Sequence, residues 1–146
     1  MINQHEAPRV LILCTGNSAR SQMAEGLLRH LAGDRFEVIS AGISASFVRQ
    51  PAIAVMQEIG IDISGHRSKS VDDFLDQKFD WVITVCDHAN KRCPVFPAKA
   101  KRIHWSIDDP VVSGSEQTQL AAFRIARDEL QKRISAFMAE TTSAKS

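Results

Sequence analysis

The chain contains no tyrosine, only three cysteines and no long apolar run among its 146 residues. No stretch approaches the roughly 18 apolar residues that a membrane-spanning helix requires, so we expect no membrane association. Lysine and arginine number 18 against 17 acidic residues, and no basic run favours nucleic-acid binding. The N-terminal residues lack the apolar core of a signal peptide. The odd number of cysteines argues against a structural disulfide framework and indicates thiol chemistry in a reducing compartment, so we predict a cytoplasmic protein.

Apolar runs typical of buried strands alternate along the chain with amphipathic helical segments. We predict strands at Val10–Leu13, Phe36–Ser40, Trp81–Val85 and Arg102–Trp105, and helices at about 21–33, 51–59, 71–75 and 116–138. This alternation favours an α/β fold whose four-stranded parallel sheet, in the order 2-1-3-4, is flanked by helices on both faces. With 44% hydrophobic residues, the chain is expected to form one domain over 1–146, with frayed ends at 1–7 and 140–146.

A cysteine at the end of the first predicted strand begins the most informative stretch. Cys14 is followed by five small or polar residues and then by Arg20, where an amphipathic helix begins. A tight loop entering a helix turns backbone N–H groups toward one point, and Arg20 would close this anion site with its planar guanidinium. We predict that Cys14 is a nucleophilic thiolate, with a pKa below the free value of about 8.5, beneath a bound phosphate-like ion. The predicted oxyanion-binding residues are Thr15, Gly16, Asn17, Ser18, Ala19 and Arg20.

Three polar sites are expected to meet at one edge of the predicted sheet. Cys14 ends the first strand, Cys86 follows the third, and Asp108-Asp109-Pro110 follows the fourth. Parallel sheets bind ligands at the carboxyl ends of their strands. In the order 2-1-3-4, the first and third strands are neighbours about 4.8 Å apart. Cys14 and Cys86 should then come within disulfide reach after modest movement.

Cys93 lies seven positions after Cys86. On an intact helix this spacing rises about 10.5 Å, too far for a disulfide, whose Cα atoms need about 4.4–6.8 Å. Pairing of Cys86 with Cys93 therefore requires the intervening segment to bend or unwind, and Pro94 blocks continuation of a helix there. A movable dithiol beside a nucleophilic thiol suggests a relay that carries oxidising equivalents outward.

These motifs resemble those of a known superfamily. The Cys14-x5-Arg20-Ser21 pattern after a strand is similar to that of low-molecular-weight protein tyrosine phosphatases. The longer match over 14–26 is closer to the thioredoxin-coupled arsenate reductases of that superfamily, as are Ser40-Ala41-Gly42, the spacing of Cys86 and Cys93, and His104-Trp105-x-x-Asp108-Asp109-Pro110. The resemblance covers residues from about 8 to 138.

The resemblance implies reduction of arsenate to arsenite by three thiols in sequence. Cys14 would attack arsenic while Asp109 protonates the departing oxygen. Cys86 would then attack the adduct, release arsenite and form a disulfide with Cys14. Cys93 would then attack Cys86 and free Cys14. Thioredoxin or a similar thiol carrier would reduce the resulting Cys86–Cys93 disulfide. Ser21 is expected to donate a hydrogen bond to the Cys14 sulfur.

The chain departs from the family pattern at two positions. Some relatives carry a further cysteine inside the anion loop, where this chain has Ala19. Several relatives bind potassium through residues that match Asn17, Glu25 and Ser40, but the position of their distal aspartate is occupied by Lys69. An ammonium group can take the place of the cation, so we predict that activity does not depend on potassium and that the chain binds no metal or other cofactor.

Two other functions fit parts of the sequence. A phosphatase acting on phosphotyrosine or another phosphomonoester would use the same loop, but Val111-Val112-Ser113 follows Asp-Pro in place of the usual aromatic residues. A non-enzymatic oxyanion or arsenite-binding module would use the thiols but leaves the activating loop unexplained. A zinc site at Cys86, His88 and Cys93 lacks a fourth ligand. We expect the protein to act as a monomer.

Overall fold

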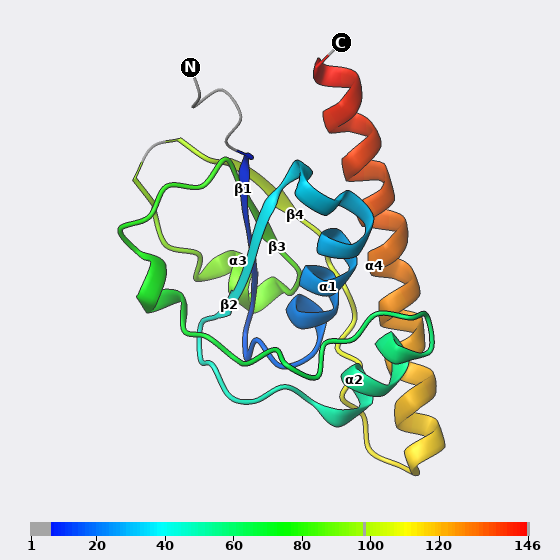
Figure 1. Cartoon of the computed structure of the whole chain (residues 1–146). Helices are drawn as coiled ribbons and strands as arrows, with labels where there is room; N and C mark the ends of the chain where they lie inside the picture. The colour runs from blue at the N-terminus through cyan, green and yellow to red at the C-terminus, as the bar shows by residue number, and fades with distance from the viewer. Residues whose placement is uncertain (1–6, 98, 146) are drawn as a thin grey trace.

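The computed structural model describes residues 7–97 and 99–145, with the side chains of 142–145 left out. Its centre is a parallel four-stranded sheet, seen in Figure 1. The strands are β1 (Arg9–Cys14), β2 (Glu37–Gly42), β3 (Trp81–Thr84) and β4 (Lys101–His104). Their order is β2-β1-β3-β4. The predicted fold class, strand order and parallel arrangement are therefore confirmed, and the strand ends shift by at most two residues.

The pairing of the strands brings their carboxyl ends to one edge of the sheet. Cys14 pairs with Gly42 across β1 and β2, Leu13 pairs with Thr84 across β1 and β3, and Thr84 pairs with His104. The chain leaves β1 and β3 at this edge through Cys14 and Cys86. The two cysteines consequently follow neighbouring strands, as predicted.

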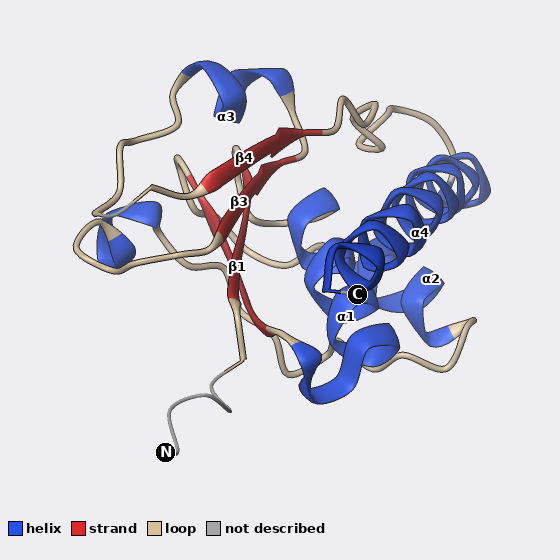
Figure 2. Cartoon of the chain, turned by 90° about the horizontal axis from the view of Figure 1, so that it is seen from above, coloured by secondary structure: helices blue, strands red, loops and turns tan. Residues whose placement is uncertain are grey.

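Among the described residues, four α-helices flank the sheet. They are α1 (Arg20–Ala32), α2 (Gln50–Gln57), α3 (Asp87–Lys91) and α4 (Glu116–Lys145), with 3₁₀ turns at Gly33–Arg35 and Val71–Phe74. Figure 2 shows α1, α2 and α4 grouped on one side of the sheet, with α3 on the other. Helix α4 continues beyond Met138 to Lys145, where we expected the frayed C-terminal end; the corresponding expectation for the N-terminus falls mostly on 1–6, outside the described residues.

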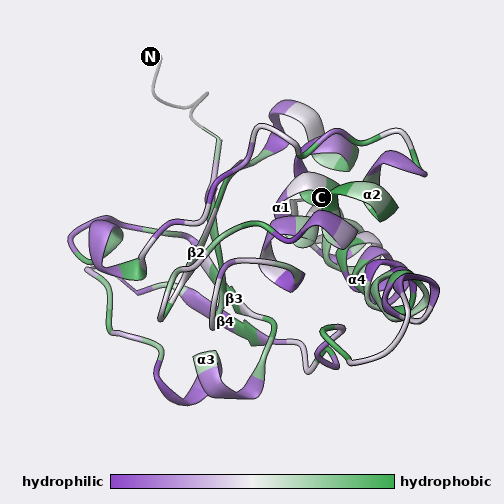
Figure 3. Ribbon diagram, turned by 90° about the horizontal axis from the view of Figure 1, so that it is seen from below, coloured by the Kyte–Doolittle hydropathy of each residue, from purple (hydrophilic) through white to green (hydrophobic). Residues whose placement is uncertain are grey.

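The core lies between the sheet and the α1–α4 layer. Buried apolar residues of the strands meet Met23 and Leu27 of α1 and Phe123 and Leu130 of α4. Figure 3 shows hydrophobic residues along β3 and hydrophobic and hydrophilic residues alternating along α4. An aromatic cluster joins α4 to the sheet, with ring centroids 5.4–6.3 Å apart, and contains Phe36, Trp81, Trp105 and Phe137. Trp105 is therefore part of the core, and the partly buried Trp81 packs against it.

Arg127 lies on the apolar stripe of α4 and is almost fully buried. Its Nη1 donates to the Val55 carbonyl at 2.7 Å and lies 2.8 Å from the Glu58 carboxylate. Its Nε contacts Asp128 at 2.9 Å. The buried nitrogens of the Arg127 guanidinium thus have hydrogen-bond partners, and the side chain connects α4 to α2 without leaving an unsatisfied donor.

In the part of the chain that the structure describes, no helix has the length and apolar character needed to cross a membrane.

Candidate active site

The backbone between β1 and α1 forms a loop whose carbonyl groups face away from its centre. The carbonyls of Thr15, Gly16 and Ser18 accept hydrogen bonds of 2.8–3.0 Å from the amides of Ser44, Ser46 and Arg49. In a planar trans peptide, the N–H of the next residue points opposite to the carbonyl. The segment after β2 therefore holds the loop with amide donors turned inward, which is the arrangement that binds an anion.

Two residues allow the loop to adopt this conformation. Asn17 has a φ of 49°, in the left-handed region that asparagine tolerates better than most residues. Gly42 packs directly beneath the loop, and a Cβ there would lie 2.7 Å from the Thr15 carbonyl oxygen and 2.8 Å from the Asn17 amide nitrogen. Only glycine fits this contact, which explains the Ser40-Ala41-Gly42 motif in physical terms.

The loop forms one wall of a pocket of about 220 Å³. The Arg20 guanidinium lines it, donates to the Ile107 carbonyl at 2.9 Å, and lies 4.0 Å from the Asp109 carboxylate. Asp109 is exposed and accepts a 3.0 Å hydrogen bond from the Val111 amide. The Asp109 side chain thus also caps the turn that contains Pro110. The full lining is Cys14, Thr15, Gly16, Ser18, Ala19, Arg20, Ser46, Arg49, Asp109 and Val111.

The structure brings the sulfurs of Cys14 and Cys86 into hydrogen-bond contact as free thiols. This contact and burial raise the pKa of Cys14, against the opposing effects of the Arg20 charge and the Thr15 amide. The same contact lowers the pKa of Cys86 to about 5. Our prediction of a resting thiolate at Cys14 is therefore wrong for this state: Cys14 keeps the proton and Cys86 carries the charge. The shared proton makes the two thiols one titrating pair.

The Cys86 sulfur has two further hydrogen-bond partners. The Thr15 hydroxyl lies 3.2 Å away, and the Ala89 amide in the first turn of α3 donates to the sulfur at 3.4 Å. Both contacts lower the pKa of Cys86, as does the charge of Arg20. Cys86 is thus a buried sulfur surrounded by donors, in contact with both the anion loop and Cys14.

Cys93 lies further along the same segment and is half-buried. A guanidinium nitrogen of Arg102 lies 3.1 Å from its sulfur, while burial raises the pKa of the Cys93 thiol. Helix α3 is a single short turn that ends at Lys91, so Cys86 and Cys93 do not lie on one continuous helix. The segment between them already contains the break that the spacing requires.

His104 and Asp87 fix α3 to the end of β4. His104 Nε2 lies 2.9 Å from the Asp87 carboxylate, and its Nδ1 lies 2.7 Å from the Thr84 hydroxyl. The Ser106 hydroxyl also donates to Asp87 at 3.1 Å, and these contacts lower the pKa of that carboxyl. The histidine therefore has a structural role.

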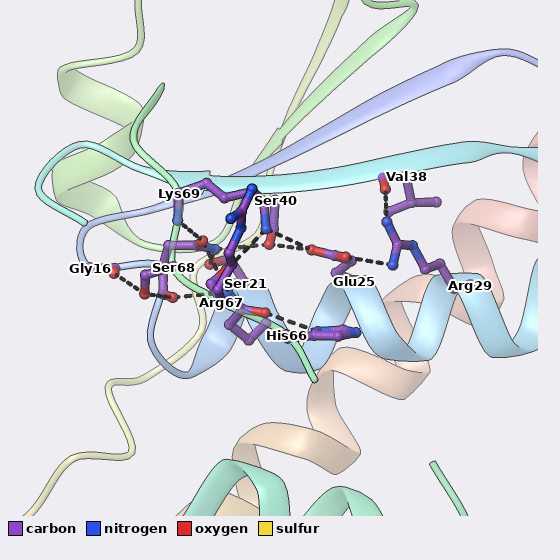
Figure 4. Close-up of polar contacts among 12 residues, drawn as sticks. Gly16, Ser21, Glu25, Arg29, Val38, Ser40, His66, Arg67, Ser68 and Lys69 are labelled. Carbon is purple, nitrogen blue, oxygen red and sulfur yellow. Dashed lines mark hydrogen bonds and ion pairs between the residues drawn. The ribbon is translucent and has the colours of Figure 1, made fainter. Parts of the chain in front are cut away.

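A buried polar cluster supports the loop from behind (Figure 4). Asn17 Nδ2 donates to the hydroxyls of Ser21 and Ser40 at 2.8 Å each, and Asn17 Oδ1 accepts from Gln22 and from the Lys69 amide. Ser21 is thus bound to Asn17, and the predicted hydrogen bond from Ser21 to the Cys14 sulfur is not among its contacts. Asn17 itself holds the loop in place from outside the pocket lining.

Lys69 supplies a positive charge within this cluster. Its ammonium lies 3.6 Å from the Glu25 carboxylate and donates to the Arg67 carbonyl at 3.1 Å (Figure 4). Glu25 is buried and also contacts Arg29 at 2.9 Å and the Ser40 hydroxyl at 2.5 Å. An ammonium group in contact with Glu25 does not fit a potassium site at this carboxylate. Within residues 7–97 and 99–145, no group of histidine, cysteine and acidic side chains is arranged to hold a metal ion.

The sequence analysis missed two pocket residues from the loop after β2. Ser46 and Arg49 lie roughly thirty residues from Cys14 in the chain, and neither belongs to a recognisable motif. They reach the pocket because their amides bind the carbonyls of Gly16 and Ser18. Only this backbone pairing, which has no pattern in the sequence, brings them to the site.

The pocket and the sheet order define a class of protein. The profile of the family described as low molecular weight phosphotyrosine protein phosphatase matches residues 9–146, so the chain belongs to that family. Within it, an arsenate reductase of Halalkalibacterium halodurans is 49% identical over 133 residues, covering 90% of this chain and 95% of that protein.

Solved structures agree with this relationship. An arsenate reductase in its oxidized state has a TM-score of 0.78 and 32% identity, covering 90% of this chain and 97% of that chain. An arsenate reductase in a phosphate binding state has a TM-score of 0.74 and 33% identity, covering 91% and 98%. The similarity therefore extends over nearly the whole of both proteins.

Proposed function

We propose that this chain is an arsenate reductase that uses Cys14, Cys86 and Cys93 in turn. The observation that carries the proposal is the hydrogen-bond contact between Cys14, which lines the oxyanion pocket, and Cys86, a second free thiol whose pKa this contact lowers. A phosphatase needs only the first sulfur, whereas reduction of arsenic(V) needs two electrons, which a pair of thiols can deliver. The similarity to arsenate reductases over nearly the whole chain supports the same assignment.

In the first step, arsenate would bind to the loop amides and Arg20. Cys14 would attack arsenic and form a sulfur–arsenic bond while one oxygen leaves as water. Asp109 lines the pocket beside Arg20 and is placed to supply a proton to that oxygen. The Cys14 proton passes to Cys86, the base in hydrogen-bond contact with it.

In the second step, Cys86 would release its proton to solvent and attack the Cys14 sulfur. A disulfide forms, the sulfur–arsenic bond breaks, and its electron pair reduces arsenic(V) to arsenic(III), which leaves as arsenite. The Thr15 hydroxyl and the Ala89 amide favour the thiolate that this attack requires.

In the third step, Cys93 would attack Cys86 and free Cys14 as a thiolate. Cys93 lies beyond the end of α3, and the five residues of this helix have little helical structure to lose if Cys93 has to approach Cys86. A thioredoxin-type dithiol would then reduce the disulfide between Cys86 and Cys93. Cys93 is the more accessible of these two cysteines, which suits it to contact with a carrier protein.

A single-turnover experiment tests the proposal against phosphatase activity. Reduced wild-type protein mixed with arsenate should form one arsenite per chain and lose two free thiols. The Cys86→Ser variant should form no arsenite but should still hydrolyse para-nitrophenyl phosphate through Cys14. Arsenite formation by Cys86→Ser at the wild-type level would overturn the thiol relay. Ester hydrolysis with no arsenite from the wild type would instead assign the site to a phosphomonoesterase.

The same chemistry bears on location and assembly. Three free thiols that must be re-reduced after each turnover require a reducing compartment, so we propose that the protein acts in the cytoplasm. Every residue assigned a role belongs to one chain, which is why we propose that a monomer suffices. We also propose that the chain binds no cofactor and that the thiol carrier is its electron donor.

A further inference from the structure

A second guanidinium lines the oxyanion pocket. Arg49 comes from the loop between β2 and α2, whereas Arg20 begins α1, yet both side chains line the same cavity as Cys14. The reaction outlined above uses Arg20 and gives Arg49 no role. A second positive charge at a pocket for a multiply charged anion calls for an explanation.

The backbone fixes the position of Arg49 relative to the loop. Its amide donates to the Ser18 carbonyl at 2.9 Å, and its own carbonyl accepts from the Ala52 amide at 3.1 Å as α2 begins. The backbone of Arg49 is therefore hydrogen-bonded directly to the anion loop, which places its side chain at the pocket.

The Arg49 side chain is held at the pocket with its hydrogen-bonding capacity unused. Its Nε is buried and, among the described residues, is the side-chain nitrogen or oxygen that lacks a hydrogen-bond partner. Its guanidinium carbon lies 5.0 Å from the centre of the exposed Phe47 ring. By contrast, the buried Arg127 donates to a carbonyl and contacts two carboxylates. A buried donor without a partner is unfavourable, and it marks a place where a ligand atom fits.

We propose that Arg49 is a second oxyanion-binding residue, which donates its Nε–H to an oxygen of the bound tetrahedral anion. The inference rests on the proposed function only in taking that anion to be arsenate or its analogue phosphate. Arg20 already gives one donor to Ile107 and lies near the Asp109 carboxylate, so its charge is partly balanced within the protein. Arg49 has no ion pair among the described residues, and its full charge is available to the ligand.

Binding of inorganic phosphate to the reduced full-length protein, measured by titration calorimetry, tests this role. Arg49→Met should weaken binding about 10-fold or more, as expected for loss of a charge-assisted hydrogen bond. The matched control is Arg133→Met, which removes the same charge from an exposed pair with Glu129 on α4. It should bind phosphate like the wild type. Equal weakening in both variants would reduce the effect to net charge and overturn the proposal, as would wild-type affinity in Arg49→Met.

Turnover distinguishes a binding residue from a structural one. With arsenate, Arg49→Met should raise KM by a similar factor while kcat stays close to the wild-type value, because the anion lost a contact present throughout the reaction. Arg49→Lys should recover part of the affinity. If Arg49→Met does not fold, Arg49→Gln decides the question by the same titration, and wild-type affinity in that variant would overturn the proposal.

The two proposals can fail separately. A wild-type chain that reduces arsenate, with an Arg49→Met variant that binds phosphate normally, would remove only the role of Arg49. Weak phosphate binding by the variant, together with no reduction of arsenate by the wild type, would keep Arg49 in the anion site and remove the reductase.

Discussion

The Thr15 hydroxyl lies 3.2 Å from the sulfur of Cys86, so the first residue of the anion loop contacts the second thiol of the relay. Thr15 follows β1 directly, and Cys86 follows β3 after one further residue. These two strands are hydrogen-bonded neighbours. One side chain thus links oxyanion binding to the state of the thiol that has to act next.

Replacing Thr15 by valine should raise the pKa of Cys86 and so destabilise its thiolate. Valine keeps the shape of threonine but removes the hydroxyl, so the thiolate loses a hydrogen bond. We expect the apparent pKa of the thiol pair to rise by about one unit, measured by ultraviolet absorbance of the thiolate during a pH titration. Thr15→Ser retains the hydroxyl and serves as the control. A valine variant that titrates like the serine variant would show that this contact has no effect on Cys86.

The same titration on the wild type tests how the two thiols share a proton. Because the pKa of Cys86 is lowered to about 5, one thiolate per chain should be present at neutral pH and should disappear as the pH falls through about 5. Cys14→Ala removes the main hydrogen bond to Cys86, and the midpoint should therefore move upward. No thiolate absorbance at neutral pH in the wild type would contradict the assignment of charge to Cys86.

Gly42→Ala should damage the anion loop. The added methyl group would lie 2.7 Å from the Thr15 carbonyl oxygen, so the loop has to shift. We expect weaker phosphate binding and a free energy of unfolding lower by about 1–3 kcal/mol, measured by denaturant titration. Gly65→Ala is the control because its Cβ would meet nothing within 4 Å, and its stability should change by less than about 0.5 kcal/mol. Equal effects of the two substitutions would argue against close packing at Gly42.

Potassium should not activate the wild-type protein. The Lys69 ammonium already lies 3.6 Å from the buried Glu25 carboxylate, where a bound cation would supply the same charge. Arsenate reduction should proceed at the same rate in potassium chloride and in sodium chloride of equal ionic strength. Lys69→Met removes that ammonium and should make activity depend on the added cation. A higher wild-type rate in potassium would contradict the role given to Lys69.

The fold was more predictable from the sequence than the electrostatics of the site. Apolar β-branched runs such as Trp81–Thr84 mark strands by their composition, and the parallel order follows from helices between them. The charge on Cys14 was predicted wrongly because it depends on contact with Cys86, seventy-two positions away in the chain, and on how deeply both are buried. The local sequence indicated the helix dipole and the charge of Arg20, both of which favour a thiolate at Cys14. It gave no measure of burial or of the Cys86 contact, which raise the pKa of Cys14.

Side-chain hydrogen bonds were equally hard to predict. Ser21 follows Arg20 in a familiar motif, yet its hydroxyl accepts a hydrogen bond from Asn17 Nδ2, which also donates to Ser40 on β2. Arg49 went unnoticed since its place at the pocket depends on one backbone hydrogen bond to Ser18. Both cases depend on three-dimensional contacts between segments that have no shared pattern.

The most direct measurement of the three-thiol relay is consumption of NADPH by wild type and Cys93→Ser in the presence of arsenate, thioredoxin and thioredoxin reductase. The wild type should turn over many times, because Cys93 frees Cys14 and presents a disulfide that thioredoxin can reach. Cys93→Ser should complete at most one turnover and stop with Cys14 and Cys86 joined. Continued turnover of Cys93→Ser at the wild-type rate would contradict the relay.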